Sequence, residues 1–151
     1  MNSAEQIVAD AERWFNTRNL EAILSCYTKD AEVEILADGI STVGVGPDQI
    51  RRIWQLVFGT FPRFTVTKKL ISADPEGAIV NEWQGQMDGT GCARGFDLFW
   101  LDAAGAIARH QVLSFGRVVE YGAAASRVRF ALLYPRHVLR ALRVEHQLGA
   151  R

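Results

Sequence analysis

The sequence predicts an α+β protein in which helices cover one face of a curved antiparallel sheet. Two observations lead to this fold class. The patterns follow the order helix, helix, strand, helix and then a series of strands, with tetrapeptides typical of turns at 74–77 and 88–91. The strand pattern at 95–101 is also apolar on both sides, so we expect this part of the sheet to be covered on both faces.

The first helix is expected at 3–17, because Ser3 and Gln6 have the spacing of a capping box and apolar residues follow at helical intervals. A short second helix is expected at 20–28. Residues 31–36 alternate between apolar and acidic side chains and predict a strand with one wet face. A glycine-rich loop is expected at 37–47, and Pro47 then opens a third helix, 47–58, at a position that tolerates a missing N–H.

Strands are expected next at about 63–72 and 78–87, followed by a hairpin over 95–115. If its turn is 102–105, Leu101 pairs with Ala106, and Asp97 lies directly opposite His110 with Cβ atoms roughly 5 Å apart. A turn longer by one residue would instead pair Asp97 with Gln111. The register therefore depends on the length of the turn.

Asp97 is a carboxylate on a strand that should be buried, and such a group must be partnered or neutral. We expect it to form either a tight ion pair with His110 or a neutral pair that shares one proton. This pair could line a functional pocket, or it could be purely structural.

Composition favours one ordinary globular domain: 151 residues, 48% hydrophobic and 23% charged. No apolar stretch is long enough to span a membrane and no secretory signal pattern is present, so we expect a cytoplasmic protein without a membrane partner. Six arginines and one acid follow residue 126. We interpret them as the solvated face of a helix, or as partners of the acidic part of the chain, rather than as a nucleic-acid site.

No metal site and no cofactor are expected. Cys26 and Cys92 do not have metal-ligand spacing, and the histidines lie far apart at 110, 137 and 146. The sequence contains no phosphate-binding loop, dinucleotide fingerprint or zinc-protease motif.

The C-terminal segment 122–151 predicts an additional helix, capped by Ser126 and kinked at Pro135, that packs on the same domain or on a partner subunit. The outward side of the strand at 95–101 carries Phe96, Leu98 and Trp100. Because helices on one face of the sheet cannot cover these side chains, we expect a homodimer.

Several segments carry a family resemblance. They are Trp14-Phe15-Asn16-Thr17-Arg18-Asn19-Leu20-Glu21-Ala22, Tyr27-Thr28-Lys29-Asp30-Ala31-Glu32-Val33-Glu34, Gly46 ahead of Ile50, Gly95-Phe96-Asp97-Leu98-Phe99 and Gly105-Ala106-Ile107. With them the chain resembles the SnoaL-like and ketosteroid isomerase-like proteins of the nuclear transport factor 2-like superfamily. The resemblance implies a domain at 1–121 that forms a cone-shaped α+β barrel of a mixed, mostly antiparallel sheet with three N-terminal helices. It also implies frequent dimerisation through the outer sheet face.

The catalytic sets of the family match only in part. Asp97 matches the aspartic acid of the oxyanion hole in ketosteroid isomerases. The tyrosine that those isomerases carry on the first helix is replaced here by Ala11. The carboxylate nearest to the position of their general base is Asp38. His110 matches the histidine of SnoaL-type cyclases, whereas the following Trp-Asp is absent. The epoxide hydrolases of this fold need an arginine that residues 82–85 lack.

The candidate site therefore combines Asp97 and His110, with Asp38 as a possible second base, and an apolar lining. The lining candidates are Trp14, Tyr27, Trp54, Phe58, Trp83 and Phe99. One hypothesis is a cofactor-free SnoaL-like isomerase, cyclase or dehydratase acting by proton transfer on a small hydrophobic oxygenated ring compound of polyketide or terpenoid type. The alternative is a non-catalytic small-molecule-binding or dimerisation module.

Overall fold

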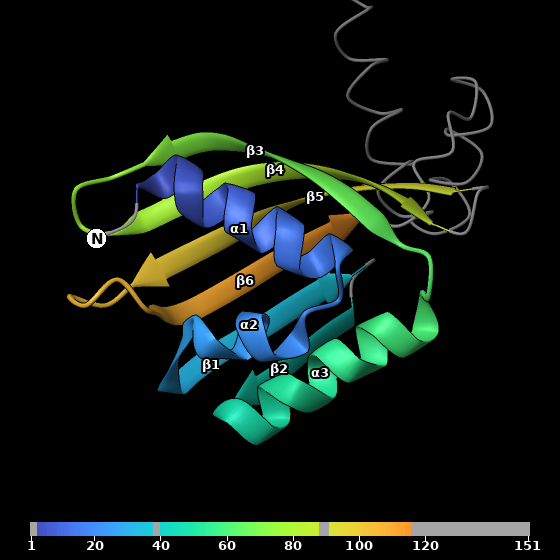
Figure 1. Ribbon diagram of the computed structural model, residues 1–151, viewed down its shortest axis with the longest axis horizontal. Coiled ribbons are helices and arrows are strands. Elements are labelled where there is room, and N and C mark those ends of the chain that lie inside the picture. The colour runs from blue at the N-terminus through green and yellow to red at the C-terminus, as the bar shows by residue number, and fades with distance from the viewer. Residues whose placement is uncertain (1–2, 38–39, 88–90, 116–151) are drawn as a thin grey trace, which may run out of the picture. The chain divides into compact units, whose positions relative to one another are not determined.

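The computed structural model describes residues 3–37, 40–87 and 91–115, which form three helices and six strands (Figure 1). The helices are α1 (Ala4–Asn16), α2 (Leu20–Ser25) and α3 (Pro47–Thr60). The strands are β1 (Tyr27–Ala37), β2 (Ile40–Val45), β3 (Thr65–Ala73), β4 (Ala78–Met87), β5 (Gly91–Leu101) and β6 (Ile107–Phe115). The predicted α+β class is confirmed.

The strands form one sheet in the order β2-β1-β6-β5-β4-β3. Only β1 and β6 pair in parallel among these neighbours, so the sheet is mixed and mostly antiparallel, as expected. The helices lie on one face of the sheet (Figure 1). The sheet is open, with β2 and β3 as its edges, and does not close into a barrel.

Strand β2 replaces the loop predicted at 37–47. It pairs antiparallel with β1, with Val43 opposite Glu34. Its glycine content, taken as a loop signal, has a packing cause at Gly44: a Cβ there would lie 2.7 Å from Cδ1 of Ile53 on α3. The close approach of α3 to the sheet therefore requires glycine within the strand.

Helix α1 begins as predicted, with the Ser3 hydroxyl accepting a hydrogen bond from the Gln6 N–H at 3.2 Å. Its far end is fixed to the edge strand β3. The Asn16 side chain donates to the Val66 carbonyl and accepts from the Val66 N–H, both at 2.8 Å. The Glu12 carboxylate accepts from the Lys68 N–H at 2.6 Å. These three hydrogen bonds hold α1 over the inner face of the sheet.

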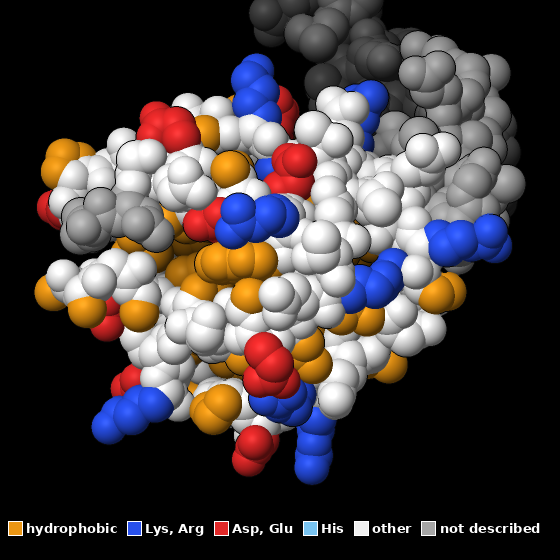
Figure 2. Space-filling view, in the orientation of Figure 1, with side chains coloured by type: hydrophobic (Ala, Val, Ile, Leu, Met, Phe, Trp, Pro, Cys, Tyr) orange, Lys and Arg blue, Asp and Glu red, His pale blue; other side chains and the backbone are white. Residues whose placement is uncertain are grey.

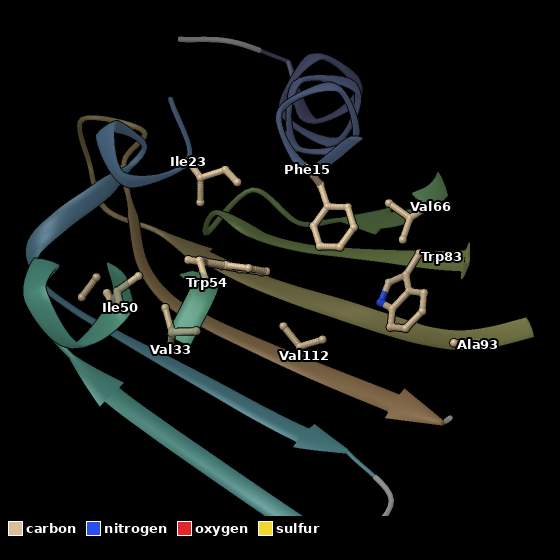
Figure 3. Close-up of a cluster of buried hydrophobic side chains, with 10 residues drawn as sticks. Phe15, Ile23, Val33, Ile50, Trp54, Val66, Trp83, Ala93 and Val112 are labelled. Carbon is tan, nitrogen blue, oxygen red and sulfur yellow. The ribbon is translucent and has the colours of Figure 1, made fainter. Parts of the chain in front are cut away.

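The main core lies between the helices and the sheet. Phe15 projects from α1 toward the sheet between Trp54 and Val66 (Figure 3). Trp83 on β4 lies over Gly95 of the paired strand β5, where a Cβ would lie 2.3 Å from the indole ring. Glycine at 95 thus makes room for a large aromatic side chain in the core.

The register of the β5–β6 hairpin differs from both predicted registers. The turn is closed by Asp102, whose Oδ1 accepts hydrogen bonds from the N–H groups of Ala104 and Ala106. Leu101 pairs with Ile107, and an irregularity next to Trp100 shifts the register once more. Asp97 consequently lies opposite Val112. Because the total displacement from the first predicted register is two residues, Asp97 and His110 still share a face of the sheet.

Three expectations involve residues outside the described ranges: the Asp38 base, positions 88–90 of the turn at 88–91, and the C-terminal helix at 122–151. Within the described part of the chain, no helix combines the length and the apolar character needed to cross a membrane.

Candidate functional site

A cavity of about 330 Å³ lies between α1, α2, α3 and the sheet. Its lining comprises Ile7, Asp10, Ala11, Trp14, Phe15, Ile23, Ser25, Cys26, Tyr27, Trp54, Lys68, Asp97, Phe99, Ala104, Gly105, Ala106, Ile107 and His110. Figure 2 shows hydrophobic side chains gathered near the centre of the helical face, with acidic and basic side chains above them. This volume is at the lower end of the range for small-molecule pockets.

The most buried charged groups of the cavity are Lys68 on β3 and Asp97 on β5. They form an ion pair between Nζ and Oδ2, with side-chain exposures of 8% and 3%. Burial by itself would raise the pKa of Asp97, but the Lys68 ammonium and His110 outweigh it and lower this pKa to about 2. Asp97 is therefore an ionised carboxylate at neutral pH.

His110 on β6 contacts Asp97 and Tyr27 through its two ring nitrogens. Nε2 lies 3.6 Å from Asp97 Oδ1, and Nδ1 lies 2.7 Å from the Tyr27 hydroxyl oxygen. With a carboxylate near Nε2, the favoured tautomer carries its proton there, and the Tyr27 hydroxyl then donates to Nδ1. Burial lowers the pKa of His110, and Asp97 offsets this only in part, so the imidazole is neutral.

These charge states revise the expected pair. The sequence suggested an Asp–His ion pair or a pair sharing one proton, whereas Asp97 pairs with the Lys68 ammonium beside a neutral His110. The result is a buried row of four polar side chains from four strands: Lys68, Asp97, His110 and Tyr27.

Aromatic rings enclose the Tyr27 end of this row. The His110 ring lies 4.6 Å from the Phe99 ring and 6.0 Å from both the Tyr27 and Trp54 rings, measured between centroids. Burial raises the pKa of Tyr27 well above its ordinary value. The nearby Trp54 indole lowers the pKa of Tyr27, but less than burial raises it. The Trp54 Nε1 has no hydrogen-bond partner among the described residues.

The structure brings six of the nine predicted site residues to the cavity: Trp14, Tyr27, Trp54, Asp97, Phe99 and His110. Phe58 and Trp83 do not line it. Phe58 packs on Phe15 and Trp54 within the core, and Trp83 is held over Gly95. The action of the six residues on a ligand stays a prediction, as does the role of Asp38.

Four polar lining residues were not predicted from the sequence: Lys68, Asp10, Ser25 and Cys26. Side chains alternate along β3, so Lys68 points to the same inner face as Val66. A cation at an inward position of a strand could have indicated a functional role for Lys68. Asp10 interrupts the apolar side of α1 in the same way. Burial raises the pKa of the Cys26 thiol to about 12, so it is not a reactive thiolate.

Within the described ranges, no group of three or more His, Cys, Asp or Glu side chains is arranged to hold a metal ion. The lining thus offers one ammonium, two carboxylates, one neutral imidazole and one phenol as its main polar groups. These groups can donate hydrogen bonds, accept them and relay protons.

Residues 8–110 match the model of the SnoaL-like domain, and the chain belongs to this family. Solved structures with the same fold include SalBIII, an epoxide hydrolase/cyclase-like enzyme connected with pyran ring formation in the polyether salinomycin. It is 19% identical, with a TM-score of 0.61 over 74% of this chain and 89% of that chain.

Two further solved structures share the fold. A candidate ketosteroid isomerase from Kribbella flavida is 16% identical, with a TM-score of 0.60 over 78% of this chain and 80% of its own. RV0760c from Mycobacterium tuberculosis, in complex with estradiol-17beta-hemisuccinate, is 19% identical. Its TM-score is 0.54, over 74% of this chain and 93% of its own. No curated protein matches the sequence significantly. At these identities the likeness extends to the fold alone.

Proposed function

We propose that this protein is a cofactor-free SnoaL-like enzyme that transfers protons on a small hydrophobic ring compound with a carbonyl group, of polyketide or terpenoid type. Isomerisation, cyclisation and dehydration all require such proton transfer next to a carbonyl. The cavity is mostly apolar and has its polar groups on one wall, which suits a ligand of this kind.

One observation carries the proposal: the Lys68–Asp97 ion pair is buried beside an open cavity. Removing two charges from water is costly, and a well-packed apolar pair of similar volume is often equally or more stabilising. A purely structural core would therefore not need this pair. A site that must position a proton relay and stabilise developing charge does need it.

In the proposed mechanism, Tyr27 and His110 act as a relay. The Tyr27 oxygen takes a proton from the carbon next to the ligand carbonyl while its own proton moves to Nδ1 of His110. The resulting imidazolium faces the Asp97 carboxylate, which stabilises its charge and orients the ring. Lys68 is a donor available to the enolate oxygen. The reverse transfer delivers the proton to a different ligand atom.

This scheme changes the role expected for Asp97. A carboxylate whose pKa is about 2 does not exchange protons near neutral pH, so Asp97 acts through His110 as a positioning residue. The same low pKa favours the alternative function, a non-catalytic small-molecule-binding module in which Lys68, Asp97 and His110 only shape the pocket.

Deuterium uptake from D₂O into 2-tetralone, a bicyclic ketone with acidic hydrogens next to its carbonyl, tests the proposal. We expect wild type to accelerate uptake over buffer, and Asp97→Asn and His110→Gln each to lose on the order of 10² to 10⁴ of that acceleration. Glu82→Gln is the matched control, because Glu82 lies on β4 away from the cavity lining.

Two results would support the binding module instead. One is that 2-tetralone binds to wild type but takes up deuterium no faster than in buffer. The other is Asp97→Asn and His110→Gln variants that both stay within about threefold of wild type, which is under ~1 kcal/mol of barrier.

A further inference from the structure

Asp10 is a second carboxylate in the cavity, and the relay described above does not use it. It lies on α1, is only 8% exposed and belongs to the cavity lining. The other lining residues from the same helix are Ile7, Ala11, Trp14 and Phe15, all apolar. A carboxylate on the buried side of an amphipathic helix is unusual unless something there needs it.

The two oxygens of Asp10 are in different situations. Both of its partners contact Oδ1: Gln6 Nε2 donates at 2.9 Å and Arg13 Nη2 at 2.7 Å. Oδ2 has no partner among the residues that the structure describes. One oxygen therefore holds the side chain in place, and the other keeps its full capacity to accept hydrogen bonds.

The helical contacts of Asp10 do not explain its burial. An Asp–Arg pair and a Gln–Asp pair at these spacings form equally well on the exposed side of a helix, where they contribute only a few tenths of a kcal/mol. Arg13 itself is 62% exposed, so the pair needs no cavity.

Free donors occupy other parts of the same lining. The Lys68 ammonium uses one of its three donors on Asp97. The Trp54 indole N–H on α3 is buried and without a hydrogen-bond partner in the described part of the chain. The cavity thus presents a carboxylate acceptor on α1 and donors on β3 and α3, with apolar surface between them.

We propose that Asp10 is a specificity residue whose Oδ2 accepts a hydrogen bond from a ligand hydroxyl group. The preferred ligand then carries a hydroxyl for Asp10 in addition to a carbonyl oxygen for the donors of Lys68 and Trp54. This inference deepens the proposed function, since it concerns the ligand of the same cavity, but it requires binding only and no proton transfer.

The test compares 6-hydroxy-2-tetralone with 6-methoxy-2-tetralone, two ring ketones that differ in the ability to donate at one end. Binding to the full chain is followed by calorimetry. We expect wild type to bind the hydroxy compound at least about tenfold more tightly, because a hydrogen bond to a charged acceptor is among the stronger ones. Asp10→Leu should bring the ratio of the two dissociation constants close to one.

Glu5→Gln is the matched control. Glu5 lies on the same helix, is exposed and does not line the cavity, so this variant removes one carboxylate and should keep the wild-type ratio. Asp10→Asn retains a neutral acceptor and should give an intermediate ratio. Circular dichroism of each variant verifies that α1 is folded.

The inference would be overturned if wild type binds the two tetralones with dissociation constants within about twofold of each other, whatever the behaviour of the variants. An unchanged ratio in folded Asp10→Leu, or no binding of either tetralone to wild type, would also overturn it. A high ratio that depends on Asp10, together with no deuterium uptake into 2-tetralone, would support the inference and contradict only the proposed catalysis.

Discussion

Removal of the Lys68 charge should change both the stability of the protein and its pH dependence. Lys68→Met keeps most of the side-chain volume and leaves Asp97 buried without its ion-pair partner. Loss of one member of a buried pair costs about 3–5 kcal/mol. We therefore expect the free energy of unfolding at pH 7 to fall by about this amount in urea titrations followed by tryptophan fluorescence.

The pH dependence follows from the pKa of Asp97. In wild type this pKa is about 2, below the ordinary value of 3.8. The ionised group thus adds about 2 kcal/mol of stability above about pH 4, and this is lost as the pH falls through about 2. In Lys68→Met, burial raises the pKa of Asp97, and the pKa of His110 rises with the loss of the nearby cation. Because both groups bind protons more readily in the folded variant than in folded wild type, the stability difference between the two proteins should shrink as the pH falls from about 8 to about 5.

The double variant Lys68→Met/Asp97→Leu separates the ion pair from general packing effects. With no buried charge left, it should recover most of the lost stability and should not become more stable on acidification over the same range. The ion-pair assignment would be refuted by a Lys68→Met variant that stays within about 1 kcal/mol of wild type at pH 7, or whose loss of stability relative to wild type does not shrink between about pH 8 and about pH 5.

Two further predictions concern α1 and the outer sheet face. Asn16→Ala should lower the free energy of unfolding by about 2 kcal/mol in urea titrations, since it removes two hydrogen bonds to the Val66 backbone. The exposed control Thr67→Ala should change this free energy by less than about 1 kcal/mol. The protein should be a homodimer through the outer face of the sheet, where Phe96 is 39% exposed and pairs with Leu113. Light scattering at high micromolar concentration should give twice the mass of one chain, and Phe96→Glu should give a monomer, whereas a monomeric wild type would contradict the expectation.

The helical part of the fold was predictable from local signals. The capping pair Ser3 and Gln6, and Pro47 at the start of a helix, act within one turn of chain, and the observed bounds of α1 differ from the predicted ones by one residue at each end. Strand β2 was missed because Gly44 indicates a loop when the sequence is taken alone. Its cause is a contact with Ile53 that exists only after α3 packs on the sheet.

The candidate site was predictable only as far as strand alternation determines it. Asp97 and His110 were placed on one face correctly, although the turn at Asp102 and the irregularity next to Trp100 moved the register by two residues. The ion-pair partner of Asp97 lies 29 residues away in sequence, on a strand that is not its neighbour in the sheet. Local patterns cannot show such a partner, and therefore Lys68 was absent from the predicted set.

The contact between α1 and β3 has a consequence for solubility. An edge strand offers unpaired N–H and C=O groups to any other extended chain, and this is how many sheets aggregate. Here the side chains of Asn16 and Glu12 occupy such groups on Val66 and Lys68, so α1 protects one edge of the sheet from strand addition. The same helix carries Asp10 and forms part of the cavity lining. A ligand that binds only when α1 is in place should therefore also delay aggregation, by reducing the population in which this edge is open.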